Sequence, residues 1–574
     1  MIIETKKLYL MRNTRLIVVL LMTVLCSIAV QAQDEDLRGD FEKYRKGAHK
    51  EFDDFRKQAL MEYSEFVRQA WKKFNAEPAV PVPQEEEVVP MLAPGADQET
   101  ASWFGNQMRK LKSAFKKKGK KVPEQVEQAE LSAKQEKPKE EKPKAKDQKP
   151  KAKVEKPKAE KPVQVTVKEV IKPKPVTKQP EPISEVKEET FLANDYMPFT
   201  VFGTTYKVRI GDNCRFKLKG LSSDAIADII SDEFTKTQYD NLLFDCLQER
   251  KKHDMSDWAY YQMLLALTRK FYGENTNEAV LVQAFLYSQS GYKMRLAHDD
   301  TRLYMLAASQ HFIYNKVFFY MDGESYFMLD EKQSDKLSIC QASFPKESSL
   351  SLQMTAAQLL DMNPTGERTI TSIKNPDFSF TIRSNKNYID FYGTYPSSNV
   401  DNNFMTRWSM YANTPLEKGI CDQLYPQMKS KLKGLSEAQA VQELLWWMHG
   451  NLDLEGVIKD SNTFLYRFDE DCWGEDRAFF GEETLFYPYC DCEDRSIMLS
   501  HLVRDLVGLD VVLVYYPGHL AMAVCFNENV DGDYIMVDGR KFIVCDPTYL
   551  GARIGQTMPG MNNSDATVIL LQKS

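Results

Sequence analysis

Aromatic residues recur every eleven positions near the start of the chain. The segments "FEKYRKGAHKE", "FDDFRKQALME" and "YSEFVRQAWKK" align in register, and the copies begin at Phe41, Phe52, Tyr63 and Phe74. Because eleven residues make three turns of about 3.67 residues each, these side chains form a nearly straight stripe along one helix face. The pattern predicts an amphipathic helix within residues 33–77.

An aromatic stripe of this kind needs a surface that covers it. One interpretation lays the helix against its own protein, and the other makes residues 41–74 a self-associating coiled coil. The sequence does not choose between them, because no second long periodic helix lies nearby.

Residues 78–190 are rich in lysine, proline and glutamate, and no aromatic residue occurs from Val122 to Thr190. Such a composition cannot bury a core, and its prolines stiffen the chain, so we expect a disordered linker that acts as an extended tether. Within it, residues 101–121 are basic and amphipathic. They suit contact with an anionic surface such as lipid, and the alternative is a solvated run of charge.

Periodic patterns of apolar residues return after residue 190. They predict helices at 222–234, 258–271, 416–433 and 436–450, and a hairpin that turns at Asp322-Gly323. Residues 338–410 alternate mostly like strands, as in "TITSI", "FSFTIRS" and "YIDFYGTY". The fold class is therefore α+β, divided into a module at 191–330, a β-rich region at 331–414 and a C-terminal domain at 415–574.

The C-terminal domain has a counterpart upstream. Both contain a helix, two strands and a hairpin in the same order and at a nearly constant spacing. The matching positions are Gly508 and Gly291, Asp538-Gly539 and Asp322-Gly323, and Asp546 and Asp330. We infer an internal duplication in which the copy at 191–330 has degenerated, and the alternative is two unrelated α/β hairpins.

The first residues have the layout of a secretory signal. Basic residues precede an apolar run from Leu16 to Val30, and "VQA" then leads into the acidic "QDED". This predicts a signal peptide at 1–32, with an uncleaved anchor as the alternative. We expect a protein exported to the periplasm or cell surface of a bacterium. The net charge of −7 is mild for so long a chain and says little about partners.

Two of the ten cysteines stand close together in "YCDCEDRS" at 489–496. In an exported protein Cys490 is able to pair with Cys472. A zinc site is disfavoured, because the spacing is C-x-C rather than C-x-x-C and no second close pair exists. The remaining alternatives for Cys492 are a core residue or a nucleophile.

Cys492 falls in the first turn of a predicted helix that ends at Gly508, with Asp491 as its N-cap. Unpaired backbone N–H groups and the helix dipole stabilise a thiolate at this position, and they also offer a donor to an oxyanion. The acids Glu493 and Asp494 oppose a thiolate, so the site needs a cation.

His519 is the candidate for that cation. It follows the Pro517-Gly518 break and opens a buried strand, "HLAMAVCF". Asp546 ends another strand, directly before a proline, where it can hold the other ring nitrogen of His519 and fix the tautomer. Cys492, His519 and Asp546 thus form a candidate catalytic triad, whereas His449 and His501 on helices are expected to be structural.

These residues resemble the transglutaminase-like superfamily, a branch of the papain-like cysteine hydrolases. The match comprises "CED" at 492–494, "GHLAMAV" at 518–524 and "CDPTY" at 545–549, and it extends from "AVQELLWWMHGNL" to the end of the chain. The resemblance implies a papain-like core, in which the helix bearing the cysteine packs on an antiparallel sheet. It also implies that the upstream copy is a non-catalytic module of similar kind.

The resemblance assigns Cys492 as nucleophile, His519 as base and Asp546 as orienting acid. It implies attack on an amide and an acyl-enzyme that passes to water or to an amine. It does not assign the oxyanion side chain, for which Tyr489, Tyr466 and Trp473 are candidates. The acidic, aromatic segment 461–489 leads into the nucleophile and is either a substrate-binding wall or a packed cover.

The leading interpretation is an exported cysteine peptidase that acts on a polypeptide or another amide. The alternatives are a glutamine acyl transferase that cross-links proteins, and a non-catalytic scaffold with a relic triad. We expect no metal, no cofactor and no nucleic-acid partner.

Overall fold

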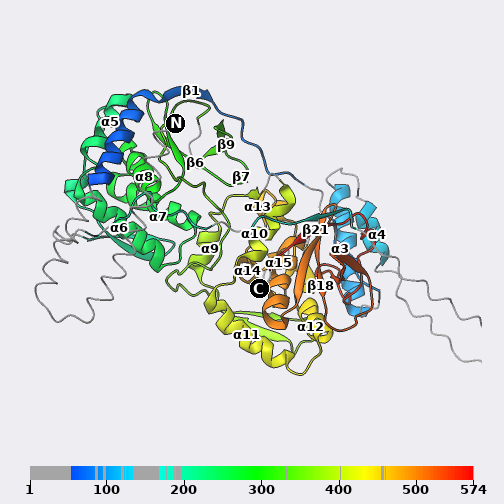
Figure 1. Cartoon of the computed structure of the whole chain (residues 1–574). Helices are drawn as coiled ribbons and strands as arrows, with labels where there is room; N and C mark the ends of the chain where they lie inside the picture. The colour runs from blue at the N-terminus through cyan, green and yellow to red at the C-terminus, as the bar shows by residue number, and fades with distance from the viewer. Residues whose placement is uncertain are drawn as a thin grey trace, which may run out of the picture.

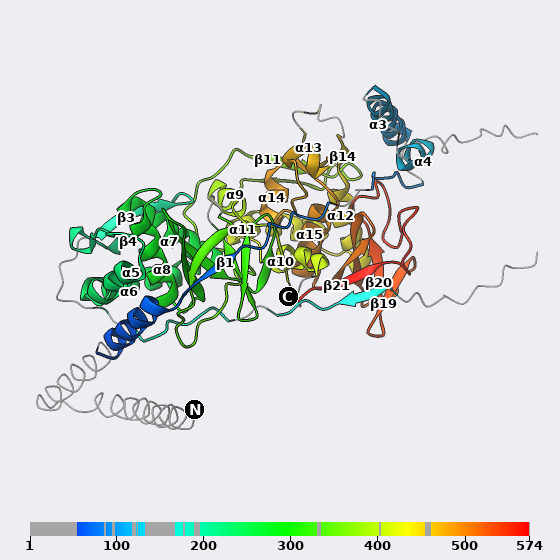
Figure 2. The same cartoon turned by 90° about the horizontal axis from the view of Figure 1, so that it is seen from above.

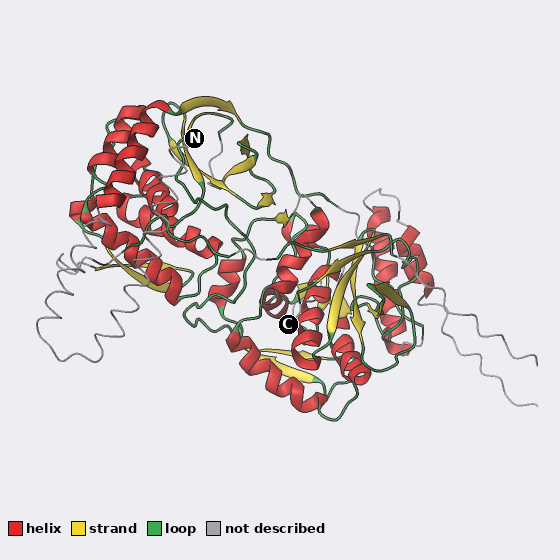
Figure 3. Ribbon diagram, in the orientation of Figure 1, coloured by secondary structure: helices red, strands yellow, loops and turns green. Residues whose placement is uncertain are grey.

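A computed structural model describes residues 54–84, 88–94, 98–117, 122, 124–132, 167–175, 178–186, 188, 196–329, 334–400, 403–453, 458 and 461–572. Within them the protein is mixed α+β, with helices packed beside several sheets, most of them antiparallel (Figure 3). The predicted signal peptide lies outside the described residues. No helix in the described ranges is both long and apolar enough to cross a membrane.

The chain forms two modules that lie side by side, an upstream module and a C-terminal module, each built on a six-stranded sheet (Figure 1). The upstream sheet consists, in spatial order, of β1 (Trp71–Asn75), β10 (Lys336–Cys340), β5 (Met294–His298), β6 (Leu303–Ala308), β9 (Glu324–Met328) and β8 (Phe318–Met321). The C-terminal sheet consists of β2 (Glu169–Ile171), β21 (Thr567–Leu570), β17 (Asp510–Tyr516), β18 (His519–Cys525), β20 (Arg540–Cys545) and β19 (Tyr534–Val537).

Apart from the edge strands β1 and β2, the five remaining strands of each sheet have the same connectivity. In each module a helix leads into two antiparallel strands, β5 and β6 upstream and β17 and β18 in the C-terminal module. A hairpin (β8–β9 or β19–β20) pairs with the second of these strands, and a later strand (β10 or β21) pairs with the first. Both hairpins turn through an Asp-Gly pair with positive φ at both residues, Asp322-Gly323 and Asp538-Gly539. This turn type matches the right-handed twist of the flanking strands. The two modules therefore share the arrangement that a duplication requires.

The helix that precedes the two central strands is α8 (Asn277–Gln289) upstream and α15 (Cys492–Leu502) in the C-terminal module. The α15 helix continues as one π-helical segment, Val503–Val507, and ends at Gly508, which has φ of +78°. A glycine at this position relieves the steric cost of the left-handed conformation. The predicted helix from Asp491 to Gly508 is thus confirmed.

The remaining helices surround these cores. Upstream they are α5 (Ser223–Asp232), α6 (Thr237–Lys252) and α7 (Asp257–Tyr272), beside the hairpin β3 (Tyr196–Val201) and β4 (Thr204–Arg209). In the C-terminal module they are α11 (Lys418–Leu432), α12 (Glu437–His449), α13 (Asp469–Trp473) and α14 (Gly481–Phe486). The four helices that the sequence predicts at 222–234, 258–271, 416–433 and 436–450 correspond to α5, α7, α11 and α12.

Short elements connect the modules. They are β7 (His311–Ile313) paired with β13 (Ser398–Val400), β11 (Arg368–Thr371) paired with β12 (Ser379–Ile382), α9 (Lys386–Tyr392) and α10 (Arg407–Asn413). The prediction of a strand at "YIDFYGTY" is wrong, because α9 occupies it. Asn385 caps this helix, and Tyr388, Phe391 and Tyr392 are buried at helical spacing, so packing overrides their preference for strands.

The predicted helix at 33–77 is shorter than expected. Residues 54–69 are helical, but Trp71–Asn75 form strand β1, which pairs with β10 at the edge of the upstream sheet. An open sheet edge supplies backbone partners that a helix continuing to Phe74 would leave unused. The repeat copies before residue 54 lie outside the described residues.

The helix at 54–69 packs on its own protein, as one of the two interpretations expects. Leu60, Tyr63 and Val67 are buried, and the Tyr63 ring stacks on Phe344 with ring centroids 4.1 Å apart. Phe66, three residues after Tyr63, remains 62 % exposed. Self-association through residues 41–74 stays a prediction.

The predicted disordered linker at 78–190 is wrong for part of its length. Helix α3 (Gln98–Lys117) packs its apolar face, including Phe104 and Met108, against α4 (Glu124–Ser132). Lys112 forms ion pairs with two acids of α4. A neighbouring helix therefore allows this basic segment to bury its few apolar residues. Its contact with an anionic surface stays a prediction.

Candidate active site

The predicted nucleophile lies at the start of α15, beside the central strand of the C-terminal sheet. Asp491 is the N-cap, and Asp494 accepts a hydrogen bond from the Asp491 backbone N–H at 3.3 Å. Cys492 is the first helical residue and is 4 % exposed. Its Sγ accepts the backbone N–H of Leu520 at 3.5 Å, so the sulfur lies next to the residue that follows His519.

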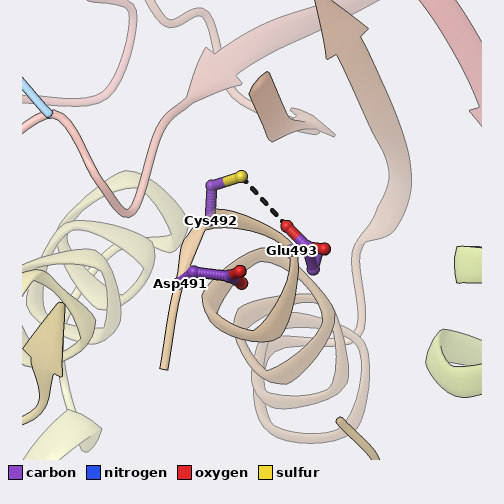
Figure 4. A group of neighbouring side chains, drawn as sticks. All are labelled: Asp491, Cys492 and Glu493. Atoms are coloured by element: carbon purple, nitrogen blue, oxygen red, sulfur yellow. Dashed lines mark hydrogen bonds between the residues drawn. The ribbon is translucent and has the colours of Figure 1, made fainter. Parts of the chain in front are cut away.

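The Cys492 thiol donates to Oε2 of Glu493 at 3.1 Å (Figure 4). Glu493 is itself buried, and burial raises the pKa of the adjacent Asp494 well above its ordinary value. The raised pKa favours a neutral Asp494, so the carboxylate that favours the protonated thiol of Cys492 is its hydrogen-bond acceptor, Glu493. A thiolate forms here only if a cation replaces the hydrogen bond to Glu493.

His519 and Asp546 are in direct contact. The turn Pro517-Gly518 between β17 and β18 places His519 at the first position of β18, and Asp546 follows the last residue of β20. His519 Nε2 lies 2.9 Å from Asp546 Oδ2, and each residue is 2 % exposed. Since Nε2 bears the hydrogen that Asp546 accepts, Nδ1 is the nitrogen left to take a proton.

Asp546 is held in its ionised form. Burial alone would raise its pKa, but His519 and the donors of Thr548 outweigh burial and lower the pKa below the ordinary value of 3.8. Oδ1 accepts from the Thr548 hydroxyl at 2.7 Å and from the backbone N–H groups of Thr548 and Tyr549. This turn, in which an aspartate binds its own downstream backbone, is signalled by "DPT", but the role of Thr548 is not predictable from that motif alone.

Two buried side chains support this arrangement from α12 and α15. His449 approaches the Asp546 carbonyl with Nε2 at 3.3 Å, and burial lowers its pKa to about 3, so the ring is neutral. Arg495 donates to the backbone carbonyls of His449 and Asn451. Since His449 is the last residue of α12, these hydrogen bonds join the end of α12 to α15.

The three oxyanion candidates occupy packed positions. Tyr489 and Trp473 belong to one aromatic cluster with Tyr487, and Tyr466 lies beneath the Arg495 guanidinium. These contacts are structural, and an oxyanion role for any of the three stays a prediction. The backbone N–H of Leu520, which already points at Sγ, is a further donor that sequence reasoning missed.

Cys490 and the other described cysteines are free thiols, so Cys490 is not paired with Cys472. Cys490 is buried on β16 (Tyr489–Cys490), and burial raises the pKa of its thiol. Asp491, Cys492 and Glu493 present ligand atoms close enough to share an ion. However, Glu493 already accepts the Cys492 proton, and nothing further marks these three side chains as a metal site.

A segment that precedes α3 lies along the loops next to His519 and Asp546. Residues 88–93, here called the crossing segment, run across the C-terminal module between β1 and α3 (Figure 2). The Val88 N–H donates to the Gly518 carbonyl at 2.9 Å, and Met91 and Ala93 exchange backbone hydrogen bonds with Leu550. The crossing segment therefore contacts the residue directly before His519 and a residue four positions after Asp546.

Of the two interpretations of segment 461–489, the contacts favour a packed cover over a substrate-binding wall. Phe479, Phe480 and Leu485 are buried, and Asp476 pairs with Arg407 at 2.9 Å. Asp469 accepts the backbone N–H of Arg477. Asp469 and Asp476 are thus bound by the protein itself.

Glu482 in this cover makes the stability of the protein depend on pH. Burial raises its pKa from 4.5 to about 7, so between these values the folded chain keeps a proton that the unfolded chain has released. The free energy of unfolding therefore falls as pH rises through this window, by about 3 kcal/mol in total. In Glu482→Gln the neutral amide still accepts the Glu417 N–H, and this fall is removed.

Urea unfolding at pH 5 and pH 8 measures this effect. We expect Glu482→Gln to match the wild type at pH 5 and to exceed it by about 3 kcal/mol at pH 8. The same change at exposed Glu475 is the control and should behave as the wild type at both values. An equal pH dependence in wild type and Glu482→Gln would refute the assignment.

Comparison of the chain with protein-family models, with curated proteins and with solved structures finds no match, so the site stands on its own geometry.

Proposed function

We propose that residues 415–574 are a cysteine-dependent amide hydrolase, a peptidase, built on a transglutaminase-like core. Cys492 is the nucleophile, His519 the base and Asp546 the acid that orients the imidazole. The observation that carries the proposal is the 2.9 Å contact between His519 Nε2 and Asp546 Oδ2. This contact lies at the start of β18, where the backbone N–H of Leu520 donates to Cys492 Sγ. The resemblance in sequence supports the same roles, since it names these three residues.

The proposed reaction begins when the Cys492 proton moves from its hydrogen bond with Glu493 to Nδ1 of His519. The resulting imidazolium is stabilised by ionised Asp546. Sγ then bonds to the carbonyl carbon of an amide, and the oxyanion is stabilised by N–H groups at the start of α15. His519 returns the proton to the amine as the C–N bond breaks, which leaves a thioester.

Water then attacks the thioester as His519 takes its proton, and the carboxylic acid leaves with regeneration of the thiol. If an amine attacks instead, the same intermediate gives a new amide and the protein is an acyl transferase. Both candidates share every residue named above and differ in the acceptor alone.

The experiment is the rate of alkylation by iodoacetamide against pH, read separately at Cys492 and Cys490 by peptide mass spectrometry. We expect rapid labelling of Cys492 down to about pH 5, because a thiolate paired with an imidazolium forms well below the ordinary thiol pKa. In His519→Ala the labelling should shift to about pH 8.5, the ordinary value. Cys490 should stay slow in both proteins.

If Cys492 alkylation rises only at about pH 8.5, and equally in wild type and His519→Ala, the catalytic proposal is wrong. The scaffold interpretation then remains. If the ion pair is present, mass spectrometry of peptide substrates with and without an added primary amine separates the two enzymes. A free carboxylic acid indicates a hydrolase, and a product that contains the amine indicates an acyl transferase.

A further inference from the structure

The upstream module has an asparagine where the C-terminal module has its nucleophile. Cys492 begins α15 and accepts the N–H of Leu520 at 3.5 Å, and Asn277 begins α8 and its Oδ1 accepts the N–H of Leu303 at 2.9 Å. The two helix starts and the two hydrogen bonds are equivalent. They align Cys492 with Asn277, whereas the spacing of 217 residues between Gly291 and Gly508 would align it with Asn275.

An arginine stands where the C-terminal module has its histidine. Leu520 pairs with Tyr515 across the central strands, and Leu303 pairs with His298 in the same way. Arg302 precedes Leu303 as His519 precedes Leu520. The nucleophile and base are thus replaced by a neutral amide and a permanent cation, which cannot perform acyl transfer but can bind a ligand.

A cavity of ≈ 40 Å³ opens beside these residues, between α7, α8 and the start of β6. A space of this size holds a few water molecules or a small polar group. Its polar lining consists of Thr268, Arg269, Asn275, Thr276, Gln283, Arg302 and Tyr304. The described lining therefore contains two guanidinium groups and no carboxylate.

Gln283 provides an independent sign of a ligand. The side chain is 3 % exposed, it lines the cavity, and its Nε2 has no hydrogen-bond partner among the described residues. A buried amide N–H without an acceptor costs about 1–3 kcal/mol, so such groups normally face a partner. Because Gln283 lines the cavity, a ligand that carries a hydrogen-bond acceptor can supply the missing partner there.

Arg302 is held at the edge of this cavity. Its Nη2 lies 3.4 Å from Asn275 Oδ1, and its backbone N–H is bound by Asp299. Asn275 has φ of +62°, a conformation that asparagine tolerates better than most residues. The loop before β6 and helix α8 thus bring the guanidinium of Arg302 and the amide of Gln283 to the same cavity.

We propose that this cavity binds the carboxylate of a small ligand, with the guanidinium of Arg302 and the amide of Gln283 as donors. A planar carboxylate suits a guanidinium fork and leaves an oxygen for the amide. The upstream module is then a binding module at the degenerated counterpart of the catalytic site. The carboxylate comes either from a free acid or from the end of a peptide chain.

Isothermal titration of the full chain with N-acetyl-alanine, a Gly-Gly-Ala peptide with a free carboxylate, and acetate tests the proposal. The amidated forms of the first two are the matched ligands without charge. We expect saturable binding of at least one carboxylate and none of its amide. Stronger binding of the peptide indicates a chain end, and equal binding of acetate indicates a free acid.

Two variants assign the site. Arg302→Gln should weaken binding about tenfold or more, because it removes a charge-assisted hydrogen bond. Gln283→Leu should lose binding while the unliganded protein keeps or raises its Tm, since it removes an unpaired polar group. Arg383→Gln, at an exposed arginine of the connecting region, is the control and should bind as the wild type.

Three results would overturn the proposal. They are the absence of binding for every carboxylate, equal binding of a carboxylate and its amide, and unchanged affinity in both Arg302→Gln and Gln283→Leu. A Tm of Gln283→Leu well below the wild type would also contradict it, because that amide would then have a structural partner. None of these outcomes depends on whether Cys492 is catalytic.

Discussion

Replacing Cys492 with alanine is expected to abolish amide hydrolysis. The substitution removes the only atom that forms the covalent bond in the proposed reaction, and removal of a nucleophile in such a site costs a factor of about 10⁴–10⁶ in kcat. The fold should survive, because alanine is compatible with the first position of α15 and the substitution removes a single sulfur atom. The side chain is buried, at 4 % exposed, so the change leaves only a small cavity. The measurement is hydrolysis of a peptide library by mass spectrometry, with Tm recorded for each protein.

The matched control is Cys490→Ala, two residues earlier in the same motif. Cys490 is buried on β16, and burial raises the pKa of its thiol, which disfavours a reactive thiolate. We expect its activity to stay within a few-fold of the wild type and its stability to fall by about 1 kcal/mol through the small cavity. If Cys492→Ala keeps its activity, or if Cys490→Ala alone loses it, Cys492 is not the nucleophile.

Asp546→Asn is expected to lower kcat/KM by about 10³–10⁴ with little change in fold. The new amide can still accept from Thr548 and Tyr549 through its oxygen. Its NH₂ group then faces Nε2 of His519 and forces the hydrogen of the ring onto Nδ1. That tautomer cannot accept the proton of the thiol, so the loss appears in chemistry rather than in stability.

A pH profile distinguishes this effect from unfolding. We expect the wild-type rate to fall on the acid side as the groups of the triad gain protons, and the Asp546→Asn rate to be low at every pH where the protein is folded. Asp538→Asn makes the same chemical change at a hairpin turn, where asparagine tolerates the positive φ, and should retain activity. A tenfold or smaller loss in Asp546→Asn would exclude Asp546 as the orienting acid.

The helix ends and strand ends around the candidate site are predictable from sequence because local rules set them. Asp491 is an N-cap, Gly508 takes the left-handed conformation after α15, and Pro517-Gly518 turns the chain so that His519 opens β18. Each of these features depends on a few adjacent residues. The contact of His519 with Asp546 follows because both residues stand at the same end of neighbouring strands.

The features that sequence reasoning misses depend on distant partners. Residues 71–75 form a strand because β10 offers an edge, and α9 is helical because its aromatic side chains meet a buried surface. The hydrogen bond between the Cys492 thiol and Glu493 joins two buried side chains, whose conformations depend on tertiary packing. The contact of the crossing segment with Gly518 has no signal in a proline- and glutamate-rich stretch.

The path of the N-terminal region has a consequence for how the protein reaches its native state. Strand β2 lies at the sheet edge in parallel with β21, so Glu169 pairs with Thr567, and the crossing segment bonds to Leu550. These early residues find their partners only after nearly the whole chain has been made, and such distant pairings are slow to form. A fragment that begins at residue 415 would leave the edge of β21 bare, as a template for aggregation.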